Sequence, residues 1–128
     1  MDVVQLKRIP LFSDASDEEL KKVAVFAETK EVEKGTEVVT EGGYSTELLA
    51  IEDGTAEVTR DGKKVAELKK GDIFGETGLL QDEMRNSTVI ATSRLKLISM
   101  GHFELKRLKK AAPDIYERIE NLVEERRG

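Results

Sequence analysis

The sequence predicts an α+β fold that is mainly β: an eight-stranded antiparallel β-roll (a double-stranded β-helix or jelly roll) flanked by N-terminal helices and two C-terminal helices. Two observations predict it. Between residues 29 and 100, short β-prone segments alternate with glycine turns about every 8–12 residues, as in a sandwich or barrel. At both ends, apolar residues instead recur at helical spacing. The length of 128 residues suits a single domain over residues 1–128.

Residues 2–28 predict helices. A short helix over residues 2–12 leads into a turn at Pro10. Ser16 and Glu19 then stand three residues apart before an apolar run, the pattern of a capping box in which each side chain accepts from the other residue's free amide. Leu20 and Val23 continue at helical spacing, so we expect a second helix there.

The β-roll is predicted over residues 29–100. Its strongest local signal is Asp61-Gly62, which separates two β-prone segments and favours a type I′ hairpin, because that turn needs positive φ at both central residues. A break at residues 74–86 interrupts the strands, and the strands STVIAT and LKLISM follow it. Two helices over residues 102–127 end the pattern, and Pro113 suits the first turn of the second.

Composition excludes several functions. The net charge of −5 disfavours nucleic-acid binding, which usually needs a basic face. No apolar run approaches the roughly 20 residues that span a bilayer. A single histidine and no cysteine leave too few ligands for a jelly-roll metalloenzyme and no nucleophilic triad. We therefore expect no catalytic residues, no metal, no cofactor and no membrane, and by elimination a cytoplasmic location.

The break at residues 74–86 carries the chemistry. Glycines at 75 and 78 let the backbone come close to a ligand, and free amides at the start of a one-turn helix would point at negative charge. Arg85 can form a charge-assisted, bidentate hydrogen bond with phosphate oxygens. Glu76 repels phosphate but is a good acceptor for sugar hydroxyls. The segment therefore suits an anion that carries a sugar.

This segment, FGETGLLQDEMRNSTV over residues 74–89, resembles the phosphate-binding cassette of cyclic-nucleotide-binding domains. That family includes protein kinase regulatory subunits, cyclic-nucleotide-gated channels and the catabolite activator protein. Phe74-Gly75-Glu76, Gly78-Leu79-Leu80, Arg85 and Thr88-Val89 fit its motif without a gap. The resemblance extends over nearly the whole chain, through the entry helix ending at Phe12, the turn at Glu41-Gly42 and the lead-in at Gly71-Asp72.

The resemblance implies a role for each cassette residue. Arg85 would pair with the cyclic phosphate, Glu76 would accept from the ribose 2′-hydroxyl, and Asn86 and Ser87 would lie near phosphate and base. The whole implied ligand set is Phe74, Gly75, Glu76, Thr77, Gly78, Leu79, Arg85, Asn86 and Ser87. In the family the last helix also covers the base, which makes Arg118 and Asn121 candidate contacts.

Thr77, Met84 and Asn86 depart from the family pattern, and Asp82 and Glu83 place two acids beside an anion site. They keep open an alternative: a degenerate fold without ligand that serves as a protein interaction or structural module. The ligand could be cAMP or cGMP, and cAMP is favoured because the threonine linked to guanine is absent after Arg85. We expect a sensor that switches its C-terminal helices for an effector protein or domain. Binding of DNA by this chain alone is not expected, because no helix-turn-helix follows the last helix.

Overall fold

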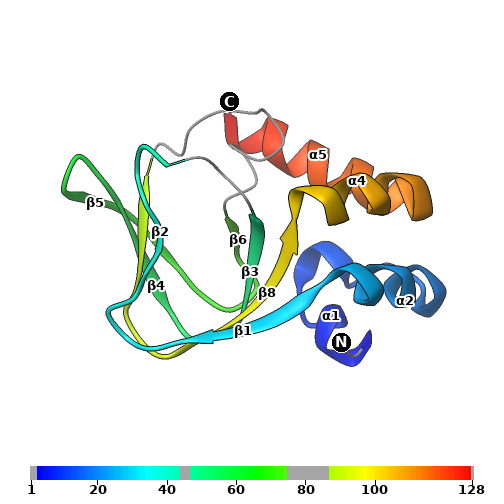
Figure 1. Ribbon diagram of the computed structural model, residues 1–128, viewed down its shortest axis with the longest axis horizontal. Helices are drawn as coiled ribbons and strands as arrows, with labels where there is room; N and C mark the ends of the chain where they lie inside the picture. Colours follow the sequence, from blue (N-terminus) through cyan, green and yellow to red (C-terminus); the bar gives the residue numbers. More distant parts are fainter. Residues whose placement is uncertain (1–2, 44–46, 75–86, 128) are drawn as a thin grey trace.

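The computed structural model describes residues 3–43, 47–74 and 87–127, with side chains described up to Asn121. Its strands form two four-stranded antiparallel sheets, which confirms the predicted eight-stranded roll (Figure 1). The first sheet has the order β1-β8-β3-β6 and the second has the order β2-β7-β4-β5. The strands are β1 (Glu28–Val32), β2 (Glu37–Val39), β3 (Glu47–Asp53), β4 (Ala56–Arg60), β5 (Lys63–Leu68), β6 (Ile73–Phe74), β7 (Thr88–Ala91) and β8 (Leu95–Gly101).

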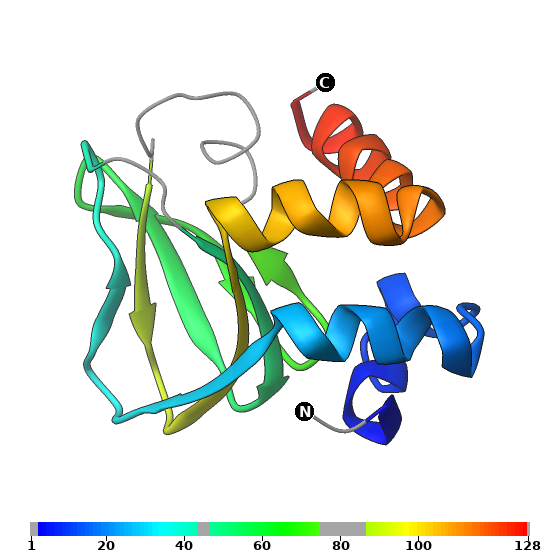
Figure 2. The ribbon, with the colours of Figure 1, turned by 45° about the vertical axis from the view of Figure 1, so that its right-hand side comes forward.

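The helices gather on one side of the roll, against the first sheet (Figure 2). They are α1 (Val3–Lys7), the 3₁₀ turn η1 (Pro10–Phe12), α2 (Asp17–Phe26), α4 (His102–Ala111) and α5 (Pro113–Arg127). The predicted capping box is confirmed at the start of α2. The Glu19 amide donates to Ser16 Oγ over 3.1 Å, and the Ser16 amide donates to Glu19 Oε1 over 3.2 Å.

Turn chemistry behaves as the sequence predicts. Asp61 has φ 54° and Gly62 has φ 77°, so both central residues of the β4–β5 hairpin take the left-handed conformation. At the N-terminus, Ile9 is extended because the following Pro10 disfavours helical backbone before it. The chain therefore leaves α1 and re-forms a single tight turn at η1. Strand β6 escapes sequence analysis because two residues are too few to show an alternating pattern.

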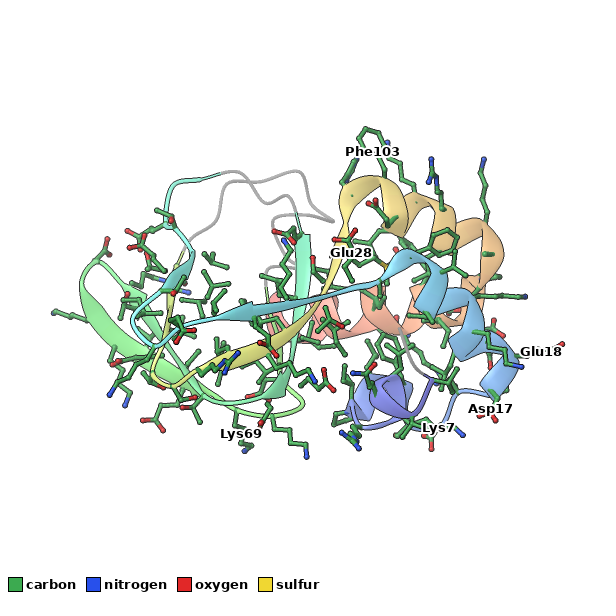
Figure 3. All side chains as sticks on the ribbon, turned by 60° about the horizontal axis from the view of Figure 1, so that its bottom comes forward. Lys7, Asp17, Glu18, Glu28, Lys69 and Phe103 are labelled. Carbon is green, nitrogen blue, oxygen red and sulfur yellow. The ribbon has the colours of Figure 1, made fainter. Side chains whose placement is uncertain are left out.

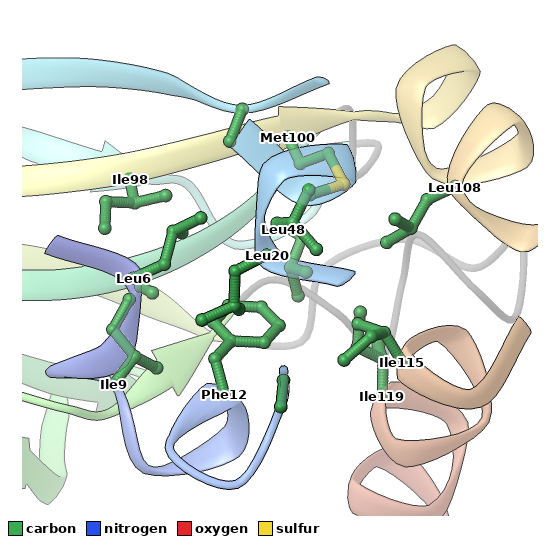
Figure 4. Packing of buried hydrophobic residues seen from close by; sticks show 14 of the residues in the cluster. Leu6, Ile9, Phe12, Leu20, Leu48, Ile98, Met100, Leu108, Ile115 and Ile119 are labelled. Atoms are coloured by element: carbon green, nitrogen blue, oxygen red, sulfur yellow. The ribbon is translucent and has the colours of Figure 1, made fainter. Parts of the chain in front are cut away.

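Buried apolar side chains form two clusters, one on each face of the first sheet. The inner cluster lies between the two sheets and contains Val39, Leu49, Ile51, Ala56, Phe74, Val89, Ala91, Leu95 and Leu97. The outer cluster lies between the first sheet and the helices, and includes Leu6, Ile9, Phe12, Leu20, Leu48, Ile98, Met100, Leu108, Ile115 and Ile119 (Figure 4). Successive residues of β3, β6 and β8 alternate between them, as the period of two in a strand requires.

The C-terminal helices turn apolar residues inward and basic residues outward. Leu105 and Leu108 of α4 are buried, while Lys106, Arg107, Lys109 and Lys110 are exposed, which gives α4 a solvated basic face. Ile115 and Ile119 of α5 are fully buried against the same cluster. Within the described residues, no helix is both long enough and apolar enough to cross a bilayer.

Candidate ligand site at the mouth of the β-roll

The two described ends of the cassette lie in different sheets. Phe74 ends β6, pairs with Leu49 of β3 and packs into the inner cluster. Ser87 directly precedes β7, which belongs to the second sheet. Residues 75–86 connect the two sheets along the chain and lie outside the described residues. The expected ligand residues Gly75, Glu76, Thr77, Gly78, Leu79, Arg85 and Asn86 fall in this segment, so their roles stay predictions.

The lead-in to the cassette is held against β3 and η1. The Gly71 amide donates to the Ile51 carbonyl over 2.8 Å, and the Ile51 amide donates to the Asp72 carbonyl over 2.9 Å. Gly71 has φ 94°, and a Cβ there would lie 3.0 Å from Pro10 Cδ, so only glycine fits this turn under η1. The Asp72 carboxylate accepts from the Lys69 amide over 2.8 Å. The polypeptide therefore enters the cassette from a fixed position.

The return from the cassette is held by two turns of the second sheet. The Glu41 amide donates to Thr88 Oγ1 over 3.0 Å, so the motif threonine fixes the turn after β2. Glu41 Oε1 in turn accepts from the Asp61 amide of the β4–β5 hairpin over 3.2 Å. This chain of contacts explains why a threonine is useful at position 88 and why an acid is useful at position 41.

The inner face of the roll is apolar in its depth and polar at its mouth. Strand β3 runs away from the mouth and β4 runs back, so Glu47 at the start of β3 and Arg60 at the end of β4 lie at the same end. By strand alternation, Glu47 shares the inner face with Leu49, and Arg60 shares it with Val58. We call the polar residues at this end the rim: Lys30, Glu47 and Ser99 on the first sheet, and Arg60 and Ser87 on the second.

Both halves of the rim are internally bonded. On the first sheet, Glu47 Oε2 accepts from Lys30 Nζ and from the hydroxyl of Ser99, which is 4% exposed. On the second sheet, Arg60 Nη2 donates to Ser87 Oγ over 3.3 Å. The first half of the rim joins two opposite charges, Lys30 and Glu47, and the second half joins a guanidinium to a hydroxyl. The sequence does not predict this pairing of Arg60 with Ser87, because only the register of β4 with β7 brings the two residues together.

The end of α4 and the start of α5 form an open groove of about 520 Å³, lined by Lys109, Pro113, Tyr116, Glu117, Glu120 and Asn121. The Lys109 ammonium lies 5.4 Å from the centre of the Tyr116 ring. Partial burial raises the pKa of the Tyr116 hydroxyl, and the charge of Glu120 raises it further. Asn121 lines this groove and Arg118 is half-buried, and their contact with a ligand stays a prediction.

In the described part of the chain, no group of three or more histidine, cysteine or acidic side chains could hold a metal ion. His102 lies exposed at the first position of α4. In the described residues, the inner face of the roll is apolar in its depth and ends in the polar rim, next to Phe74 and Ser87.

Solved structures share this architecture. A cAMP-bound structure described as PfPKA-R (141-441) superposes with a TM-score of 0.79 at 26% identity, over 94% of this chain and 45% of that one. A structure of PKAR CBD2 bound to Sp-2Cl-cAMPS has a TM-score of 0.78 at 28% identity, over 92% of this chain and 82% of that one. The catabolite activator protein of Thermus thermophilus shares the fold, with a TM-score of 0.83 at 21% identity over 91% and 57% of the two chains.

Comparison of the amino-acid sequence with known proteins identifies the family. Residues 29–111 match the family described as cyclic nucleotide-binding domain, so the chain belongs to that family, as its cassette predicted. It is 42% identical to a cAMP-dependent protein kinase regulatory subunit of Yarrowia lipolytica over 105 residues, which make up 80% of this chain and 28% of that protein. It is 40% identical to the corresponding subunit of Eremothecium gossypii over 80% of this chain and 23% of that protein. The chain thus spans about a quarter of the length of these relatives.

Proposed function

We propose that this chain is a non-catalytic regulatory module that binds cAMP at the mouth of its β-roll, within one domain over residues 1–128. The observation that supports the proposal is that the two described ends of the cassette lie in opposite sheets, with Phe74 in β6 and Ser87 directly before β7, beside one apolar cluster. The cassette residues keep the roles that their chemistry suggests. Arg85 would pair with the cyclic phosphate, and Glu76 would accept from the ribose hydroxyl.

Thermal unfolding with cAMP, cGMP, 5′-AMP or no nucleotide tests this function. A ligand at a hundred times its dissociation constant adds about 2.7 kcal/mol, or roughly 8–14 °C for a domain of this size. We expect a shift of that order with cAMP, a smaller shift with cGMP, and none with 5′-AMP. Absence of any shift at millimolar cAMP would contradict the proposal and would favour the degenerate module instead.

The matched variants are Arg85→Ala and Arg94→Ala. Losing the phosphate's charge partner removes roughly 2–5 kcal/mol of affinity, so Arg85→Ala should abolish the shift. Arg94 pairs with Glu31 on the surface, at the opposite end of the roll, and Arg94→Ala should keep the cAMP shift. Equal shifts in the two variants would show that Arg85 does not hold the ligand.

Switching would proceed through Ile73, which directly precedes the cassette, and Phe74, which begins it. Ile73 packs into the outer cluster beneath the helices, and Phe74 packs into the inner cluster. A displacement at this point is therefore felt on both faces of the first sheet, and a ligand that prefers one arrangement shifts the population toward it. Amide spectra of α4 and α5 with and without cAMP should differ. Identical spectra in a protein that binds cAMP would exclude the switch.

The effector would be a protein kinase, because the curated relatives are named as kinase regulatory subunits. The expected readout is inhibition of a kinase catalytic subunit by this chain and relief of that inhibition by cAMP. A lack of inhibition under conditions where cAMP binds would assign the output to another class of partner.

A further inference from the structure

Strand β5 lies at the edge of the second sheet (Figure 1). The order β2-β7-β4-β5 means that, within the described residues, β5 pairs with β4 on one side and has no strand on the other. Its first five residues are exposed, and Val65, at 53% exposure, is the one exposed large apolar side chain of the described strands. An edge strand with free backbone donors and acceptors is a template for another strand.

A bulge in β5 places two opposite charges on one face. The pairing with β4 skips Val65, because Lys64 and Ala66 lie opposite successive residues of β4. Lys64 and Glu67 are three positions apart, which in a strand without a bulge would put them on opposite faces. Here both lie on the outer face of the sheet, where they form an ion pair.

The charges of β5 are complementary to themselves when two copies of the strand run antiparallel. With a two-fold axis between Val65 and Ala66, Lys64 lies opposite Glu67 of the second copy, and the first residue of each strand lies opposite the last. Directly opposite residues share a face, which this register satisfies for both charges. A shift by one residue would set Lys64 opposite Ala66 or Leu68, which lie on the inner face.

We propose that β5 is an interaction surface for a second copy of this chain, with the two β5 strands paired antiparallel about that axis. The proposal is independent of nucleotide binding. Lysines on an edge strand discourage pairing with unrelated strands, whereas a second copy supplies an acid opposite each Lys64. Each Lys64 then lies between two carboxylates, its own Glu67 and that of the second copy, and the facing strand covers Val65.

The contact involves one strand from each copy. It is therefore smaller than the roughly 800 Å² per partner of a standard stable interface, and we expect a weak dimer that depends on concentration. Sedimentation velocity without nucleotide should show the average mass rising from one chain towards two between about 10 μM and 1 mM protein. A wild-type chain that stays monomeric at the top of this range would overturn the proposal.

Two charge reversals test the register. Lys64→Glu sets acids opposite one another across the axis, and Glu67→Lys sets lysines opposite one another, so each variant alone should be monomeric. In a mixed pair every acid again faces a lysine, so the 1:1 mixture should associate as the wild type does. Each chain has lost its own ion pair whether it is mixed or not. A folding defect therefore cannot produce this rescue.

Arg94→Glu is the matched control for these reversals. It makes the same change in charge as Lys64→Glu, at an exposed site that pairs with Glu31, and it should associate as the wild type does. A mixture of the two reversed chains that stays monomeric would overturn the proposed pairing. Unaltered association of Lys64→Glu alone would overturn it as well.

Disulfide cross-linking locates the contact, because the chain has no cysteine of its own. Directly opposite residues of an antiparallel pair are close enough to be bridged. Differently tagged Lys64→Cys and Glu67→Cys chains should therefore form a mixed disulfide under mild oxidation. The control is Glu57→Cys, since Glu57 lies opposite Glu67 on the same face but one strand further from the edge. Equal cross-linking of Lys64→Cys to both would overturn the proposal.

Discussion

The two faces of the first sheet differ in what packs against them. Its inner face packs against a second sheet and opens at one end into a polar rim, while its outer face is covered by helices. Both faces are equally dry, because residues of β3 from Leu48 to Glu52 are all at most 5% exposed. Such a sheet transmits strain, since close-packed interiors are poorly compressible. The contrast teaches that the face where we propose the ligand and the face where we propose the output are separated by a single sheet, whose strands β3, β6 and β8 contribute side chains to both clusters.

Substitutions at Leu48 and Leu49 should have the largest effect on stability. They test the comparison directly, because the two residues are adjacent but face opposite clusters. Leu48 lies among Leu20 and Met100 in the outer cluster (Figure 4), whereas Leu49 packs in the inner one. Either substitution to alanine should cost about 2–5 kcal/mol of unfolding free energy, measured by urea denaturation.

Hydrogen exchange should then separate these two variants. Leu48→Ala should increase amide exchange most in α2 and α4, and Leu49→Ala should increase it most in β4 and β7, because local opening follows the packing that was lost. The same exchange pattern in both variants would mean that the two clusters unfold as one cooperative unit.

A substitution at Gly54 tests the inner cluster alone, at the end of the roll opposite the rim. It has φ 100°, and a Cβ there would lie 2.3 Å from the Arg94 carbonyl oxygen and 2.9 Å from Leu95 Cδ2. Gly54→Ala should therefore cost about 2–4 kcal/mol, combining backbone strain with overpacking. The control is Gly62→Ala, at φ 77° with no atom within 4 Å of the added Cβ, which should cost about 1–2 kcal/mol. Equal losses in urea midpoint would show that contact with the β7–β8 turn does not matter.

The smallest effect is expected in the helical region, where Lys7 of α1 pairs with Asp17 at the start of α2 (Figure 3). The hydrogen bond and charge of Lys7 hold the pKa of the Asp17 carboxyl below its ordinary value of 3.8, and Lys21 adds to this. A lowered folded-state pKa gives stabilisation that is present above pH 3.8 and is lost as the pH falls through the folded-state value. Asp17→Asn should therefore lower the urea midpoint slightly at pH 6 and less at pH 3.

Repeating the Asp17→Asn measurement in a Lys7→Met background tests whether Lys7 causes the pKa shift of Asp17. Without the ammonium group, Asp17→Asn should lose most of its dependence on pH, since Lys7 is the principal cause of the shift. An unchanged pH dependence in Lys7→Met would assign the shift to Lys21 and to the positive end of the helix dipole.

Much of the scaffold of the site could be predicted, because its signals are local. The motif at residues 74–89 predicted the family, and Gly71-Asp72 predicted the lead-in that the structure ties to β3. The roles of Glu76 and Arg85 came from the resemblance and remain predictions. The rim could not be predicted from local signals. Ser87 stands 27 residues after Arg60, and Ser99 stands 52 residues after Glu47, so no window of sequence contains either contact.

By itself, the sequence determined the features that depend on a few neighbouring residues. Asp61-Gly62 fixed a hairpin because its φ angles are a property of those two residues, and Ser16 with Glu19 fixed the start of α2. Only the tertiary structure decided which face each apolar residue serves, because both clusters draw on the same kinds of side chain. It also decided that Arg60 meets Ser87, since strand register is set by the packing of the whole roll and is absent from either segment alone.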